Sequence, residues 1–138
     1  MLGVDFTALA RELAPEGGRI RLVGNLPYNL SSPILFHAIE HAASIHDMVF
    51  MLQKEVVDRM VAEPGSKAYG VPSAKLAWFA DARRAGPVPR AVFWPVPNVD
   101  SGLVRMVRRE PPATTATREQ VFQVIDLAFA QRRKMLRA

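Results

Sequence analysis

The chain has 138 residues, of which 49% are hydrophobic, and this size and composition suit one domain with its own core. Cysteine is absent, no apolar run reaches membrane-spanning length and the first residues lack a signal-peptide pattern, which excludes a disulfide framework and predicts a cytoplasmic protein. The net charge of +5 favours an anionic partner, with nucleic acid as the first candidate.

The first two predicted elements are a helix and a strand. Residues Asp5–Leu13 place apolar side chains on one helical face, and Pro15 closes that helix. The apolar run Arg19–Val23 then fits a buried strand that Gly24 ends. The residues after Gly24 therefore stand at the carboxyl end of a strand, which faces the ligand in open α/β sheets.

The loop that follows carries the chemistry of an amino-group acceptor. Pro27 fixes its own φ and biases Leu26 to an extended conformation, so the carbonyls near Asn25 and Leu26 are held outward. An Asn side-chain oxygen and a backbone carbonyl can both accept from one amino group, and Tyr28 can stack on the ring that carries it. The pattern indicates a planar base with an exocyclic amine, but it is also typical of a plain strand-ending turn.

The next predicted helix begins at Ser31 or Ser32 and ends near Ala43. Within it, His37–His41 matches the His-x-x-Glu-His pattern of one class of zinc peptidases. A catalytic zinc needs a third protein ligand, and no motif supplies one, because His46 is too close along the chain for an easy approach. We therefore expect no metal site.

A parallel pair of strands is predicted from the spacing of the next apolar run. Met48–Leu52 is of strand length, and the helix before it leaves room for a right-handed crossover. Lys54–Ala62 reads as an amphipathic helix, and Glu63–Gly70 as a turn-forming stretch. In that stretch Lys67 and Tyr69 can touch a phosphate or a base, although it is equally consistent with an ordinary surface loop.

The last predicted strands are joined by a proline-rich arm. A helix over Pro72–Ala80 precedes a strand over Ala82–Val88, which Gly86 and its following proline confine to an edge or a bulge. Ser101–Arg108 is consistent with a final strand that pairs antiparallel with it. Between these strands, prolines at 95 and 97 stiffen the chain and present Phe93 as a rigid aromatic; the alternative is a structural connection with a buried aromatic.

The C-terminal segment is predicted to be a linker followed by a helix with a basic end. Residues 110–117 have linker composition, and the apolar residues from Val121 onward predict a helix. Arg132, Arg133 and Lys134 either complement the dipole at the helix C-terminus or grip RNA phosphates.

Five motifs together resemble the KsgA-type ribosomal RNA adenine dimethyltransferases, in the family's order and spacing. They are Gly24-Asn-Leu-Pro-Tyr28, Met51-Leu-Gln-Lys-Glu-Val-Val-Asp-Arg59, Pro64-Gly-Ser-Lys-Ala-Tyr-Gly70, Phe93-x-Pro-x-Pro-x-Val-Asp-Ser101 and Phe129-x-Gln-Arg-Arg-Lys134. The resemblance implies an α/β protein with a Rossmann-like class I methyltransferase fold, here incomplete. It implies that 1–109 form the C-terminal half of that domain, 110–117 a linker and 118–138 the start of a helical RNA-binding domain.

The resemblance also implies an activity. Members dimethylate N6 of two adjacent adenosines in small-subunit (16S) rRNA during ribosome biogenesis, with S-adenosylmethionine as cofactor and the pre-30S particle as partner. Carried over by position, Asn25 and the Leu26 carbonyl would receive the adenine amino group, and Tyr28 and Phe93 would stack on its two sides. Asn25 and Pro27 would also border the cofactor.

The chain departs from the family in the cofactor-binding segments. It has no Gly-x-Gly-x-Gly loop and no acidic residue after it for a ribose. We therefore expect the N-terminal half of the enzyme to be missing, and the chain alone neither to bind the cofactor tightly nor to methylate RNA. The edge of the strand at 19–23 would then be exposed and would promote self-association. Alternatives are a DNA or large-subunit rRNA adenine methyltransferase, a glutamine-amide methyltransferase, and a non-catalytic RNA-binding fragment.

Overall fold

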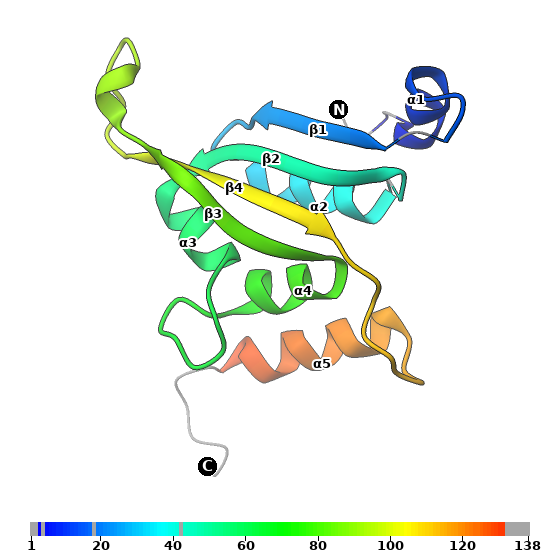
Figure 1. Ribbon diagram of the computed structural model, residues 1–138. Helices are drawn as coiled ribbons and strands as arrows, with labels where there is room; N and C mark the ends of the chain where they lie inside the picture. Colours follow the sequence, from blue (N-terminus) through cyan, green and yellow to red (C-terminus); the bar gives the residue numbers. More distant parts are fainter. Residues whose placement is uncertain (1–2, 4, 18, 42, 132–138) are drawn as a thin grey trace.

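A computed structural model describes residues 3, 5–17, 19–41 and 43–131. Its centre is a four-stranded mixed sheet in the order β1-β2-β4-β3 (Figure 1). The strands are β1 (Ile20–Asn25), β2 (Ile45–Gln53), β3 (Ala80–Val88) and β4 (Ser101–Arg108). β1 and β2 are parallel, whereas β4 is antiparallel to both β2 and β3. The α/β prediction, the parallel first pair and the antiparallel last pair are confirmed.

The helices that follow β1 in the chain lie on one side of the sheet. They are α2 (Ser31–His41), α3 (Lys54–Met60), α4 (Val71–Phe79) and α5 (Arg118–Ala130). Figure 1 shows α2, α3 and α4 beneath the strands and α5 beneath α4 as a further layer, while α1 (Phe6–Leu13) stands beside the start of β1. The structure has no helix in its described part that is long and apolar enough to cross a membrane.

The core lies between the sheet and these helices, because every second strand residue points to the helical side. In β2, Met48, Phe50 and Leu52 are almost fully buried, and the residues between them are less so. β4 contributes Val104 and Met106 to the same layer. The helices supply the opposite wall with Leu35, Ile39, Val57, Met60 and Leu76.

Several predicted boundaries were wrong by a few residues. Gly24 does not end β1, because it pairs with Phe50 and the parallel ladder continues to Asn25. β2 is longer than the apolar run Met48–Leu52, since neighbours on both sides hold its polar ends in the sheet. The pairing of the strands overrides the weak strand preference of a single glycine or of polar residues.

β3 is an edge strand, as Gly86 and its following proline predicted. Its register with β4 shifts between Arg84 and Gly86, and the φ angle of Gly86 is 158°. The irregularity lets proline stand in a strand whose outer side makes no ladder bonds. β1 forms the other edge of the sheet, which confirms the exposed edge expected there.

The face of the sheet opposite the helices carries an ion cluster that crosses three strands. Asp47 of β2 accepts from Arg105 of β4 at 3.0 Å twice, and from Arg21 of β1 at 3.1 Å. The hydrogen bonds from Arg105 hold the pKa of the Asp47 carboxyl below its ordinary value. The cluster therefore links the edge strand β1 to the centre of the sheet.

Asp47→Asn should lower stability near neutral pH and flatten its dependence on acid. A carboxyl whose folded pKa is lowered stabilises the fold above its unfolded pKa and loses that contribution as the pH falls through the folded pKa, here below about pH 4. Urea unfolding at several pH values measures this. Asp81→Asn is the control, because Asp81 is 63% exposed and makes one longer contact, of 3.4 Å, to Arg109. Parallel acid profiles for parent and Asp47→Asn would contradict the prediction.

Candidate functional site

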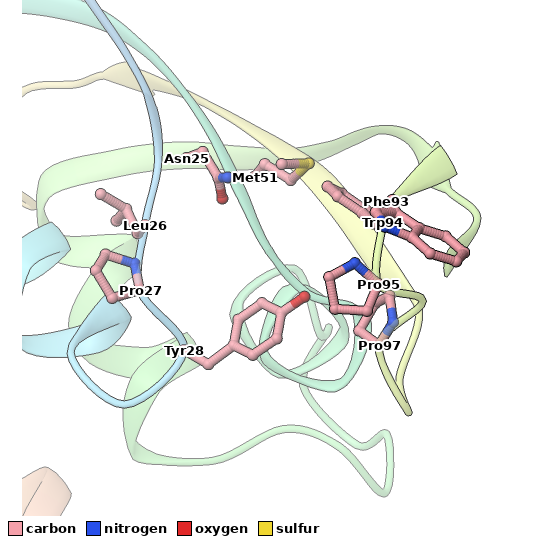
Figure 2. A pocket seen from close by; sticks show the side chains of 9 residues that line it. All are labelled: Asn25, Leu26, Pro27, Tyr28, Met51, Phe93, Trp94, Pro95 and Pro97. Carbon is pink, nitrogen blue, oxygen red and sulfur yellow. The ribbon is translucent and has the colours of Figure 1, made fainter. Parts of the chain in front are cut away.

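An open cleft of about 430 Å³ lies between the carboxyl end of β1 and the proline-rich arm, which is the segment 89–100 that joins β3 to β4. It is lined by Asn25, Leu26, Pro27, Tyr28, Met51, Phe93, Trp94, Pro95 and Pro97. Figure 2 shows the β1 residues on one side and the arm residues on the other, with the Asn25 amide and the Tyr28 ring toward the space between. The structure thus brings together five residues that the sequence placed in one site, from segments more than 60 residues apart.

The β1 side of the cleft offers two hydrogen-bond acceptors. Leu26 is only 6% exposed and its N–H donates to the Met51 carbonyl at 3.2 Å, which fixes the backbone as it leaves the sheet. Asn25 is exposed, and in the described part of the chain no hydrogen bond engages its amide or the Leu26 carbonyl oxygen. Neither oxygen is therefore engaged among the described residues, and each can accept from an N–H donor that reaches it.

Both the side-chain hydroxyl and the backbone carbonyl of Tyr28 lie within hydrogen-bond distance of a serine. Its hydroxyl lies 3.2 Å from the Ser101 hydroxyl at the start of β4, and its carbonyl accepts from the Ser31 hydroxyl at 3.3 Å. Ser101 is 1% exposed, whereas Tyr28 is 41% exposed. The ring is therefore anchored by a buried group while part of its surface stays open for stacking.

The arm is fixed by the residue that precedes Ser101. The Asp100 carboxylate accepts from the Arg90 N–H at 3.1 Å, at the start of the short 3-10 helix η1 (Arg90–Val92). The Phe93 N–H then donates to the Arg90 carbonyl at 3.2 Å, and the Asp100 carbonyl accepts from the Lys54 N–H at 2.9 Å. Phe93 is half-buried and lines the cleft, so its ring is not buried in the core.

This arrangement can hold a flat heterocycle by its faces and its amino group. Tyr28 and Phe93 stand on different walls, and Asn25 and Leu26 supply the acceptors. The volume falls within the range of small-molecule sites. Pro27 lines the same cleft, next to Asn25, where the sequence placed the edge of a cofactor site.

Other predicted residues lie away from the cleft. Lys67 and Tyr69 belong to the loop between α3 and α4, and the Tyr69 ring packs 5.9 Å from that of Phe129 in α5. Arg132, Arg133 and Lys134 lie outside the described residues.

The histidine pattern in α2 has no third potential metal ligand beside it in the described part of the chain. The His37 and His41 rings are 4.6 Å apart, but no group of three or more potential ligands is found among the described residues.

Sequence reasoning missed Met51, Trp94 and the anchoring pair Asp100–Ser101. Strand alternation around the buried Phe50 was a signal for Met51, which pairs with Asn25 across β1 and β2. The roles of Asp100 and Ser101 depend on the return of β4 beside β2, which no local pattern specifies.

A mixed sheet of this topology, with a cleft at the carboxyl end of a parallel strand, fits the Rossmann-like architecture of class I methyltransferases. The structure resembles a dimethyladenosine transferase from Plasmodium falciparum, with a TM-score of 0.69 and 28% identity over 84% of this chain and 42% of that one. It also resembles the 23S rRNA methyltransferase ErmE, with a TM-score of 0.68 and 26% identity over 82% of this chain and 46% of that one.

The sequence profile of the family "Ribosomal RNA adenine dimethylase" matches residues 1–138, and the chain belongs to this family. Relatives named ribosomal RNA small subunit methyltransferase A include those of Thermobifida fusca, 56% identical over 90% of this chain and 43% of the relative, and Streptomyces griseus, 60% identical over 85% and 40%. The chain thus spans less than half the length of these relatives. The resemblance inferred from the five motifs is confirmed.

Ser101→Ala should release the Tyr28 ring. The chain has two tyrosines, so labelling with 3-fluorotyrosine gives two ¹⁹F resonances, of which Tyr28→Phe identifies one. Loss of the hydroxyl partner should shift and narrow the Tyr28 signal, leave that of Tyr69 unchanged, and lower the free energy of unfolding by about 0.5–1.5 kcal/mol. Ser44→Ala, at an exposed serine, is the control. An unmoved Tyr28 signal would mean that Ser101 does not hold the ring.

Proposed function

We propose that this chain is the adenine-accepting part of a longer enzyme that dimethylates N6 of two adjacent adenosines in small-subunit rRNA, using S-adenosylmethionine. The observation that carries the proposal is that one cleft brings together two acceptors without a hydrogen bond among the described residues, Asn25 and the Leu26 carbonyl, and two aromatic residues, Tyr28 and Phe93. These groups match the amine and the flat faces of adenine. The names of the relatives support the same class of substrate.

The chain's own residues act by binding and orienting the amine. The two N–H groups at N6 donate to the Asn25 side-chain oxygen and to the Leu26 carbonyl, which draws the nitrogen lone pair out of conjugation with the ring. Tyr28 and Phe93 hold the purine so that this lone pair points in one direction. Positioning and fixed dipoles would supply the rate. As the N–C bond formed, the methyl–sulfur bond of the sulfonium would break and the amine would lose one proton to solvent, which leaves one N–H to donate in the second transfer.

The cofactor supplies an electrophilic methyl group on a sulfonium. Asn25 and Pro27 fit its methyl-bearing end, because both line the cleft beside the acceptors. The sequence contains no glycine-rich loop for the nucleotide portion, so we propose that the rest of the cofactor is held by residues that this chain does not contain.

Small-subunit rRNA is favoured over large-subunit rRNA as the substrate. Relatives named for the small subunit are 56–60% identical to this chain, whereas ErmE, named for 23S rRNA, is 26% identical. We include a pre-30S particle as partner and the cytoplasm as location in the proposal. Residues 118–138 are proposed to begin a helical RNA-binding domain after a linker at 110–117.

Asn25→Ala should lower methyl transfer ~10²-fold or more and leave RNA affinity within a few-fold, because its bond to N6 matters most as the amine reacts. The assay uses a hybrid enzyme in which this chain replaces the matching segment of the Thermobifida fusca relative, with small-subunit rRNA as substrate. Asn29→Ala is the control, since Asn29 is exposed in the same loop and does not line the cleft. Dimethyladenosine formation at the parental rate by Asn25→Ala would remove Asn25 from the mechanism.

Replacing Arg132, Arg133 and Lys134 with alanine should weaken RNA binding by the hybrid and flatten its salt dependence. For each phosphate that the protein no longer neutralises, the slope of log affinity against log salt becomes shallower by about 0.7–0.9. Lys67→Ala tests in the same titration whether the loop between α3 and α4 also neutralises a phosphate. An unchanged slope in the triple variant would mean that these three residues neutralise no RNA phosphate.

A further inference from the structure

Trp94 is the most exposed large apolar residue in the described part of the chain. The residue is 94% exposed, although tryptophan is usually well buried. It nevertheless lines the cleft beside Phe93, and Figure 2 shows the indole extending outward from the Phe93 side. No ring contact or hydrogen bond of its indole occurs among the described residues. An indole left open at the edge of a binding cleft requires an explanation.

The segment that carries Trp94 is held in place before any ligand arrives. Its two ends are joined by the Asp100 carboxylate, which accepts from the Arg90 N–H, and by the Arg90 guanidinium, which donates to the Asn98 carbonyl at 3.4 Å. Prolines 95 and 97 stiffen the backbone just after the indole. A ring presented from such a segment loses little conformational entropy on binding.

The neighbourhood of Trp94 is apolar and faces solvent. Val92, Val96 and Val99 are 65%, 53% and 42% exposed on the same arm, which projects beyond the end of the sheet (Figure 1). Exposed apolar groups gathered at one place mark an interaction site. Because this site adjoins a cleft that fits a purine, on a chain of net charge +5, a nucleobase suits it better than an unrelated protein surface.

We propose that Trp94 stacks on the nucleobase next to the adenosine held in the cleft, in single-stranded RNA. This inference rests on the proposed function. A target base in the cleft stays joined to its polynucleotide, so its neighbour lies at the rim, and unpaired bases are commonly bound by stacking on aromatic side chains. With two adjacent adenosines as substrate, the one not in the cleft occupies this second platform.

Stacking by itself does not read base identity, because every base has a π-face. Trp94 is therefore expected to set affinity for RNA and the placement of the pair, and the cleft to select adenine. The indole would raise the affinity for RNA when a base is present next to the target adenosine, and it would not change the affinity when that base is missing. This dependence separates stacking from a general apolar or structural role.

The test is a binding cycle with the hybrid enzyme and short fluorescent RNAs that contain two adjacent adenosines. Trp94→Ala should weaken binding at least about fivefold, and Trp94→Phe, which keeps an aromatic ring, should lose less. With an RNA in which the neighbour of the target is an abasic residue, parent and Trp94→Ala should bind equally. Val96→Ala, an exposed apolar truncation on the same arm, is the matched control and should change affinity by less than about twofold on either RNA.

Three results would overturn the inference: equal affinity of parent and Trp94→Ala for the intact RNA, a loss that persists on the abasic RNA, or an equal loss in Val96→Ala. The melting temperature of each variant is measured alongside, and a large fall confined to Trp94→Ala would assign the indole to packing instead. The binding cycle does not depend on turnover. If Trp94→Ala weakens binding only when the neighbouring base is present, but the hybrid does not transfer methyl groups, only the proposed function fails. If the hybrid transfers methyl groups but the effect of Trp94→Ala does not depend on the neighbouring base, only the stacking role fails.

Discussion

The site depends on one constraint, the attachment of both cleft walls to two adjacent residues at the start of β4. Ser101 meets the Tyr28 hydroxyl on one side, and Asp100 binds the Arg90 N–H at the base of the arm on the other. Ser101 also pairs with Gln53 and Val88 across the neighbouring strands, so it is fixed by the sheet itself. The positions of the two aromatic walls are therefore tied to the paired strands of the sheet.

The rest of the structure supports this junction. β1 delivers Asn25 to the end of the sheet by parallel pairing with β2, and the buried side chains beneath β2 and β4 hold those strands against α2, α3 and α4. On the other face, Asp47 joins β1 to β4 through two arginines. A cleft built on strand ends in this way needs little rearrangement to accept a flat ligand, which reduces the entropic cost of binding.

Local sequence was sufficient where one pattern decided the structure. Ser101–Arg108 was predicted to the residue because its apolar run is bounded by polar residues, and Gly86 marked the irregularity in β3 correctly. Asn25 and Tyr28 were predicted to share a site because Pro27 restricts the backbone between them, and both line the cleft; their roles toward a ligand stay predictions. The extension of β1 through Gly24 and the anchoring roles of Asp100 and Ser101 were not found, because each arises from pairing between segments distant in the chain.

In the proposed complex, adenine lies between Tyr28 and Phe93 with its amine on Asn25 and Leu26. A crystal structure of the hybrid enzyme with adenosine bound tests this most directly. We expect a purine in the cleft, with N6 about 3 Å from both the Asn25 side-chain oxygen and the Leu26 carbonyl oxygen. A purine bound elsewhere, or one in the cleft with N6 turned to solvent, would contradict it.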